Sequence, residues 1–144
     1  MAVTAKAYGP ALAALASGSI NWASDTIKVA LCTSTYTPDQ DNHDFFNDIT
    51  NEVTGTGYTA GGATLGTKTS TYTAGTNTQA IDAADTTWAS STITARYAII
   101  YKSTGTAATS PLIAYVDFGV DVVSTAGNFT ITWDAAGILT LTTA

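Results

Sequence analysis

The sequence has little charge of either sign. Asp, Glu, Lys and Arg make up 11% of its 144 residues, whereas an ordinary soluble domain has about 25%. The five basic residues are scattered along the chain and form no cluster: Lys6, Lys28, Lys68, Arg96 and Lys102. With a net charge of −6, the chain is expected to bind neither nucleic acid, which requires a basic patch, nor an anionic membrane surface.

Side chains that bind metals or act as nucleophiles are equally scarce. Cys32 is the single cysteine and His43 the single histidine, which excludes an intrachain disulfide and the usual three-ligand catalytic zinc sites. Cys32 lies in the run Ile27–Cys32 and is interpreted as a small buried side chain. No G-x-S-x-G motif accompanies His43, and nothing singles out a pair of carboxylates. The sequence therefore predicts no catalytic residue, no metal site and no cofactor, and we expect no enzyme activity.

Long apolar stretches are missing as well. No run reaches the roughly 18 residues that a transmembrane helix needs. The N-terminal stretch A-L-A-A-L-A-S-G is short, follows Gly9-Pro10 and is preceded by one lysine. No signal peptide is predicted from it.

The sequence is rich in threonine and in period-two alternation. Threonine makes up about a fifth of the residues, and its β-branched side chain favours strands. Alternation predicts strands at residues 27–31, 92–102, 112–118, 129–133 and 138–142, with weaker ones at 67–73 and 78–82.

Two of these patterns allow more detailed predictions. In residues 92–102, strict alternation places five side chains on one face of a strand: Ile93, Ala95, Tyr97, Ile99 and Tyr101. The segments Phe129–Trp133 and Ile138–Thr142 are separated by the turn sequence D-A-A-G. They are predicted to form a hairpin.

Together the strands predict an all-β fold, a single-domain antiparallel β-sandwich of jelly-roll-like type. A chain of this length buries about 70% of its unfolded surface and needs no disulfide. Helical turns are expected only in Ala7–Ser17, which Gly9-Pro10 limits to about two turns, and in Asn42–Asp48. We therefore divide the chain into an N-terminal arm or short helix, residues 1–20, and a β-sandwich domain, residues 21–144.

A glycine-rich stretch, Thr54–Thr69, has a spacing close to that of a phosphate-binding loop. Gly61 and Gly66 are separated by four residues, but Thr67 stands where the loop lysine belongs and Lys68 comes one residue late. The residues that follow have a strand pattern, whereas a phosphate-binding loop leads into a helix. The stretch is interpreted as a flexible connection between layers.

The acidic segment, residues 39–52, departs from the pattern of a calcium-binding loop at three positions. His43 occupies the fifth position, Asp44 stands where glycine is needed, and Thr50 stands where the bidentate glutamate belongs. The segment thus predicts a solvated loop whose Phe45-Phe46 pair points inward, while a less regular cation site stays open as an alternative.

Aromatic residues are the remaining candidates for binding. On an exposed sheet face they would suit stacking on a carbohydrate, but their place in alternating strands favours core packing. The residues concerned are Trp22, Trp88, Trp133, Tyr36, Tyr58, Tyr72, Tyr97, Tyr101 and Tyr115.

Three segments resemble a family of small structural proteins encoded by tailed bacteriophages. They are S-D-T-I-K-V-A-L-C-T-S-T-Y-T-P-D-Q-D (Ser24–Asp41), T-N-E-V-T-G-T-G-Y-T-A-G-G-A-T-L (Thr50–Leu65) and F-T-I-T-W-D-A-A-G-I-L-T-L (Phe129–Leu141). The similarity covers nearly the whole chain, and T-N-E-V-x-G-x-G-Y-x-x-G-G is its most specific part. In such proteins this block resembles a structural loop and implies no nucleotide.

The resemblance implies a virion protein, with capsid decoration (cement) as the expected role. The expected partners are the major capsid protein lattice and further copies of the chain, in a dimer or trimer. Residues 1–20 are expected to lie against a partner chain. Three alternatives stay open: a tail protein, a head-fibre protein and a carbohydrate-binding module.

Overall fold

The computed structural model describes residues 2–143, and strands account for 46% of the chain against 10% in helices. Five strands form one sheet in the order β1 (Thr4–Ala7), β7 (Leu112–Ile131), β6 (Thr86–Lys102), β2 (Ile27–Cys32) and β3 (Ala63–Thr64). A smaller sheet has the order β4 (Thr69–Thr73), β5 (Thr78–Asp82) and β8 (Leu139–Thr142). All pairings are antiparallel. The predicted all-β, sandwich-like fold is confirmed.

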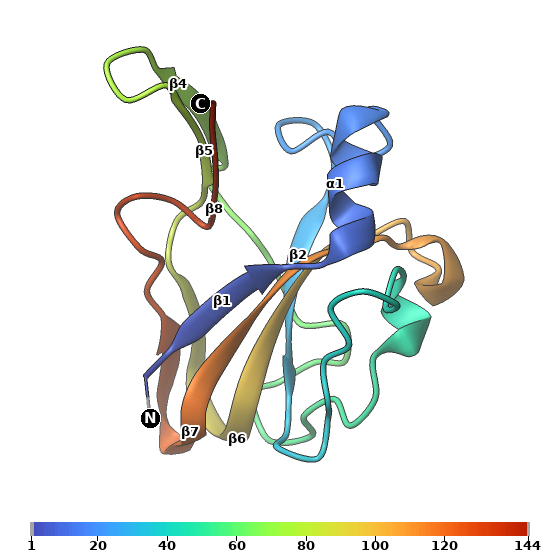
Figure 1. The fold of residues 1–144 in the computed structure, drawn as a ribbon. Helices are drawn as coiled ribbons and strands as arrows, with labels where there is room; N and C mark the ends of the chain where they lie inside the picture. Colours follow the sequence, from blue (N-terminus) through green and yellow to red (C-terminus); the bar gives the residue numbers. More distant parts are fainter. Residues whose placement is uncertain (1, 144) are drawn as a thin grey trace.

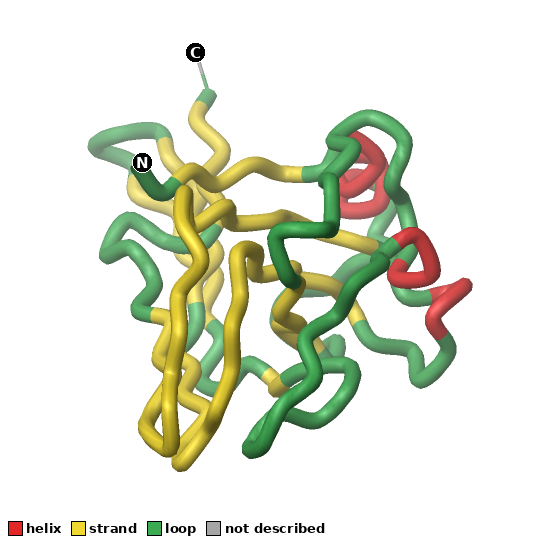
Figure 2. Tube along the Cα trace, turned by 90° about the horizontal axis from the view of Figure 1, so that it is seen from below, coloured by secondary structure: helices red, strands yellow, loops and turns green. Residues whose placement is uncertain are grey.

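Three short helical segments gather on one side of the molecule (Figure 2). They are α1 (Gly9–Ala16), η1 (Phe46–Asp48) and η2 (Ala107–Thr109). Pro10 stands at the start of α1, where its missing N–H costs no hydrogen bond. In the described part of the chain, no helix is long and apolar enough to span a membrane.

Around β2, the larger sheet is buried on both faces. In β2, Val29 and Leu31 face the inter-sheet cluster, while Ala30 and Cys32 face a second, outer cluster. The outer cluster is completed by residues before and after β2: Tyr8, Ala11, Tyr36 and the half-buried Phe46 and Ile49. Because both faces are covered, β2 is an almost continuous apolar run.

Strand irregularities change the face of several side chains. The register between β6 and β7 shifts between Ala95 and Tyr97. Ile93 and Ala95 therefore belong to the inter-sheet cluster, whereas Tyr97, Ile99 and Tyr101 pack in or against the outer one. The prediction that all five share one face is wrong, because β6 advances two residues across this shift while β7 advances five, and the alternation of β6 reverses there.

The same shift marks a bend in the β6–β7 pair, visible at the bottom of Figure 1. Arg96 and Asp117 form an ion pair of 2.5 Å there. After the bend, β7 returns toward its own first half, so that Phe118 and Phe129 lie with ring centroids 6.2 Å apart. A bent strand of this kind borders the interior of the sandwich on two sides.

The predicted hairpin of residues 129–133 and 138–142 is wrong. The first segment ends β7 and pairs with β6, while the second contains β8 and pairs with β5 in the smaller sheet. The connection between them carries the chain from one sheet to the other (Figure 1). Alternation identified both strands, but their partners are set by tertiary packing. The weaker strands, β4 and β5, are the pair that forms a hairpin.

Residues 4–20 belong to the fold of their own chain. β1 pairs with β7 in the register Thr4↔Asp117 to Ala7↔Ala114. Tyr8 is 0% exposed, and Ile20 is buried in the inter-sheet cluster. This differs from the predicted arm on a partner chain, because the small residues expected to dock elsewhere form an edge strand and a short helix.

Candidate functional site

An apolar groove runs along β1 on the inter-sheet face of the larger sheet. We call it the β1 groove. It has two adjoining compartments of about 480 Å³ and about 350 Å³, which share Ala5, Val116, Asp134, Gly137 and Ile138. The larger compartment is completed by Val3, Phe118, Val122, Phe129, Thr130, Ile131, Thr132 and Trp133. The groove therefore exposes part of the sandwich interior beside the edge strand β1.

β1 leaves one of its edges unpaired among the described residues. The Tyr8 N–H donates to the Ile113 carbonyl of β7 at 3.0 Å. Because alternate residues of a strand turn their peptide groups to the same side, Lys6 and Thr4 also face β7. The peptide groups of Ala5 and Val3 face away from it.

The hydrogen bond at the end of β1 supports this assignment. The Gln40 side-chain amide donates to the outward carbonyl of Ala7 at 2.9 Å. The accessible part of the edge is therefore confined to Val3 and Ala5, next to the groove.

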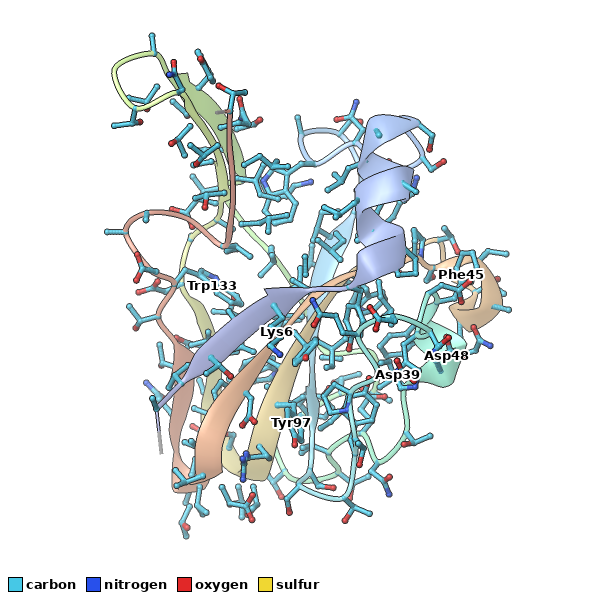
Figure 3. The ribbon with its side chains drawn as sticks, in the orientation of Figure 1. Lys6, Asp39, Phe45, Asp48, Tyr97 and Trp133 are labelled. Atoms are coloured by element: carbon cyan, nitrogen blue, oxygen red, sulfur yellow. The ribbon has the colours of Figure 1, made fainter. Side chains whose placement is uncertain are left out.

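Several apolar side chains around the groove are exposed. Val3 is 64% exposed and Val122, in the far wall, is 39% exposed. Val120 and Val123 of β7 are also exposed. Trp133, half-buried on the connection that follows β7, forms another part of the wall (Figure 3).

The glycine-rich loop lies directly against β2. A Cβ atom on Gly62 would lie 1.9 Å from the Val29 carbonyl oxygen and 2.6 Å from the Ala30 Cα. The Lys68 ammonium donates to the Asp25 carbonyl. The loop is thus packed by its backbone onto the sheet, and its lysine holds a neighbouring loop.

Glu52 and Tyr58 lock this loop in place. The Tyr58 hydroxyl donates to the Glu52 carboxylate at 2.7 Å and accepts from the Leu31 N–H at 2.9 Å. The same carboxylate accepts from the Gly61 N–H, and the Gly61 carbonyl accepts from Tyr101. These contacts give a structural reason for the glutamate, tyrosine and glycines of T-N-E-V-x-G-x-G-Y-x-x-G-G.

The carboxylates of the acidic segment bind their own backbone. The Asp39 carboxylate accepts from the Asp41 and Asn42 N–H groups at 3.1 Å, and Asp48 accepts from the Asp44 N–H at 2.9 Å. The Asn42 side-chain amide also donates to Asp39, at 2.9 Å, and is the main cause that lowers the pKa of this carboxyl. The hydrogen bond from the Asp44 N–H lowers the pKa of Asp48. Figure 3 shows both residues on the side of the molecule away from Trp133. Among residues 2–143, no group of three or more metal-ligating side chains gathers there or elsewhere.

His43 ends a chain of hydrogen-bonded side chains. Its Nδ1 atom accepts a hydrogen bond from the Asp39 N–H at 3.3 Å. Because this nitrogen is an acceptor, the Tyr36 hydroxyl, 2.9 Å away, donates to it as well. The Tyr8 hydroxyl then donates to Tyr36 at 3.0 Å. The chain satisfies two phenols in the outer cluster, and it ties the segment after β2 to the N-terminal residues.

Burial of phenols and of the single thiol predicts a loss of stability at alkaline pH. Burial raises the pKa of Tyr36 and of Tyr101 to about 12, and that of the Cys32 thiol to about 12. As the pH rises, these groups lose their protons in the unfolded chain before they do so in the folded protein, starting at about pH 8.5 for the thiol and about pH 10 for the phenols. The stabilisation is complete below these values and is lost as the pH rises to about 12.

Thermal unfolding followed by circular dichroism between pH 8 and 12 measures this loss. The Tm of the wild type should fall steeply above pH 10. Tyr101→Phe should flatten the fall, whereas Tyr72→Phe, at a side chain that is 54% exposed, should leave it unchanged. A Tm that stays constant across this range would contradict the prediction.

Most of the aromatic candidates are core residues. Trp22 and Trp88 are 5% and 6% exposed, and Tyr36 is 1% exposed. Tyr72, in the smaller sheet, is the clear exception. The core-packing interpretation therefore holds for the tryptophans before residue 130, while Trp133 borders the β1 groove.

Comparison with known proteins adds no relative. No protein-family model, curated protein or solved structure matches this chain.

No pattern in the sequence predicted the β1 groove. Its walls come from residues 3–5, 116–137 and Ile138, which become neighbours only through the bend of β7 and the crossing between sheets. The alternation V-T-A-K-A at residues 3–7 is the one local signal that could have identified the edge strand.

Proposed function

We propose that this chain is a structural protein of a tailed-bacteriophage virion, most specifically a capsid decoration protein. It would bind the major capsid protein lattice in many copies, with no catalytic role. The observation that carries the proposal is the unpaired edge of β1 beside an apolar groove, because such an edge can add a strand from another chain.

The low charge of the chain is consistent with this role. A surface with few charged residues loses little hydration when it lies against a neighbour. Weak contacts suffice when many copies bind one lattice, since further contacts among the copies raise the overall avidity. A closed dimer or trimer on a symmetry axis of the capsid is the proposed arrangement.

The resemblance of residues 24–41, 50–65 and 129–141 to small phage structural proteins supports the same proposal. Tail and head-fibre proteins would share the need for an exposed docking edge. The experiment below separates a tail protein by its location, and a head-fibre protein by its copy number, which would be far below that of the major capsid protein. A carbohydrate-binding role has less support, because the tryptophans lie in the core or in the groove wall and Tyr72 stands alone in the smaller sheet.

Purified virions of the phage that encodes the chain provide the test. Mass spectrometry should find the protein in a copy number comparable with that of the major capsid protein. Cryo-electron microscopy should place it on the outer surface of the head, and virions without it should release DNA at a lower temperature. Density confined to the tail would support the tail alternative, and absence from virions would refute the proposal.

A further inference from the structure

We propose that the β1 groove binds an extended strand from a partner protein, with apolar side chains at alternate positions and a lysine or arginine beside Asp134. The strand pairs with the free edge of β1. This inference rests on the proposed function for the partner being another virion protein, and it names the surface through which the chain docks.

The backbone of β1 provides the first requirement. The Tyr8 N–H donates to the Ile113 carbonyl of β7. Ala5 lies an odd number of residues, three, before Tyr8, so its N–H and carbonyl face the opposite edge, away from β7. The Gln40 side chain already covers the outward carbonyl of Ala7. A guest strand would therefore be centred on Ala5 and would extend toward Val3, where the edge is open.

The groove provides the second requirement. Ala5 pairs with Val116, so both side chains point to the inter-sheet face, where Phe118 and Val122 continue the apolar surface. A strand paired with β1 turns every second side chain to this face. Alternate apolar residues of the guest would thus fill the groove while the others remain in solvent, as in other cases of strand addition.

The charge of Asp134 determines which guest strand the groove favours. Asp134 borders both compartments, and its carboxylate accepts from the Ala136 N–H at 2.8 Å. Neither of the two ion pairs formed by the described residues includes it. Lys6 also borders the smaller compartment, but its pairing with Tyr115 turns its side chain to the outer face.

A basic residue on the guest would therefore complement Asp134. A second copy of this chain would instead bring a further net charge of −6 to the groove, which opposes its approach.

The probe is a hexapeptide of alternating valine and threonine with one lysine. Its matched controls carry glutamate in place of lysine, or the same residues in an order without alternation. Binding is followed by the indole fluorescence of Trp133 in the groove wall and by the amide resonances of Val3 and Ala5. We expect the lysine peptide to bind more tightly than both controls at low salt, and Asp134→Asn to remove its advantage over the glutamate peptide.

Two proline variants test the pairing itself. Ala5→Pro removes an N–H on the free edge of β1. The Tm should therefore be unchanged, while peptide affinity falls about tenfold. Thr4→Pro removes an N–H that faces β7 and should lower the Tm. If Ala5→Pro does not fold, Val122→Asn, which places a neutral polar group in the apolar groove wall, takes its place and should weaken binding equally.

The outcomes are distinct. Equal binding of all three peptides, or wild-type affinity in Ala5→Pro and Val122→Asn, overturns the inference. A wild-type dimer in sedimentation that Ala5→Pro dissociates identifies a second copy as the occupant and also overturns it.

If Ala5→Pro decorates virions as well as the wild type does, the groove is not the docking surface although the proposed function stands. If the lysine peptide binds but the protein is absent from virions, the groove stands and the proposed function fails.

Discussion

Replacing Gly62 with alanine should lower the free energy of unfolding by about 3 kcal/mol or more. Gly62 has φ = +72°, a conformation that side chains disfavour. Its missing Cβ would lie 1.9 Å from the Val29 carbonyl oxygen and 2.6 Å from the Ala30 Cα. These are backbone atoms in the middle of β2, so neither can move without breaking the pairing of β2 with β6. The loop would have to lift away from the sheet.

Lifting the loop would have further consequences. The Gly61 N–H and carbonyl would lose Glu52 and Tyr101, and the Tyr58 hydroxyl would lose its place between Glu52 and Leu31. Each buried polar group left without a partner adds to the cost. The expected decrease in Tm is about 10 °C.

Urea denaturation measures this effect, with Gly66→Ala as the matched control. Gly66 lies in the same glycine-rich stretch, but a Cβ atom there meets nothing within 4 Å and its φ is not positive. Gly66→Ala should change stability by less than about 1 kcal/mol. Similar stabilities for the two variants would show that the loop is not held against β2.

Deleting residues 1–20 should abolish cooperative unfolding of the remaining chain. The deletion removes β1 and its four paired positions on β7. It also removes Tyr8, which is 0% exposed, together with Ala11 and Ile20, which are 1% and 3% exposed. Truncation of one buried aromatic residue alone costs about 3–5 kcal/mol, and a domain of this size is stable by only about 5–15 kcal/mol.

Calorimetry and amide-resonance dispersion test the deletion, and two further variants separate its causes. Tyr8→Ala should give a folded protein of much lower Tm, because the outer cluster loses a fully buried aromatic ring and the Tyr36 hydroxyl loses its hydrogen-bond partner. Deletion of residues 1–3 should keep a cooperative transition, since Val3 is 64% exposed. A well-folded protein without residues 1–20 would instead favour the detached arm that the sequence suggested.

The elements that the sequence predicted well are those with uninterrupted local signals. The strands predicted at 27–31, 67–73 and 78–82 and the two-turn helix at Pro10 depend on alternation, β-branched residues and proline geometry, all of which act within a few residues. The predicted face of Tyr97 was wrong, because the register shift between Ala95 and Tyr97 leaves no signal that alternation can detect.

The candidate site divides in the same way. The sequence predicted a structural connection, without a phosphate site, in the glycine-rich stretch. The contacts of Gly62 and Lys68 show that this stretch packs on β2 and on the loop at Asp25. The β1 groove could not be foreseen, because Ala5, Phe118 and Asp134 are far apart in the chain and none has an unusual local context.

By itself, the sequence determined that this protein is an all-β domain with a sparsely charged surface, because strand formation and charge are local and additive properties of the residues. Only the tertiary structure decided which strands pair, that residues 4–20 complete the sheet, and that a groove opens beside β1. The physical reason is that pairing, register shifts and crossings between sheets depend on the packing of residues that the chain brings together over more than a hundred positions.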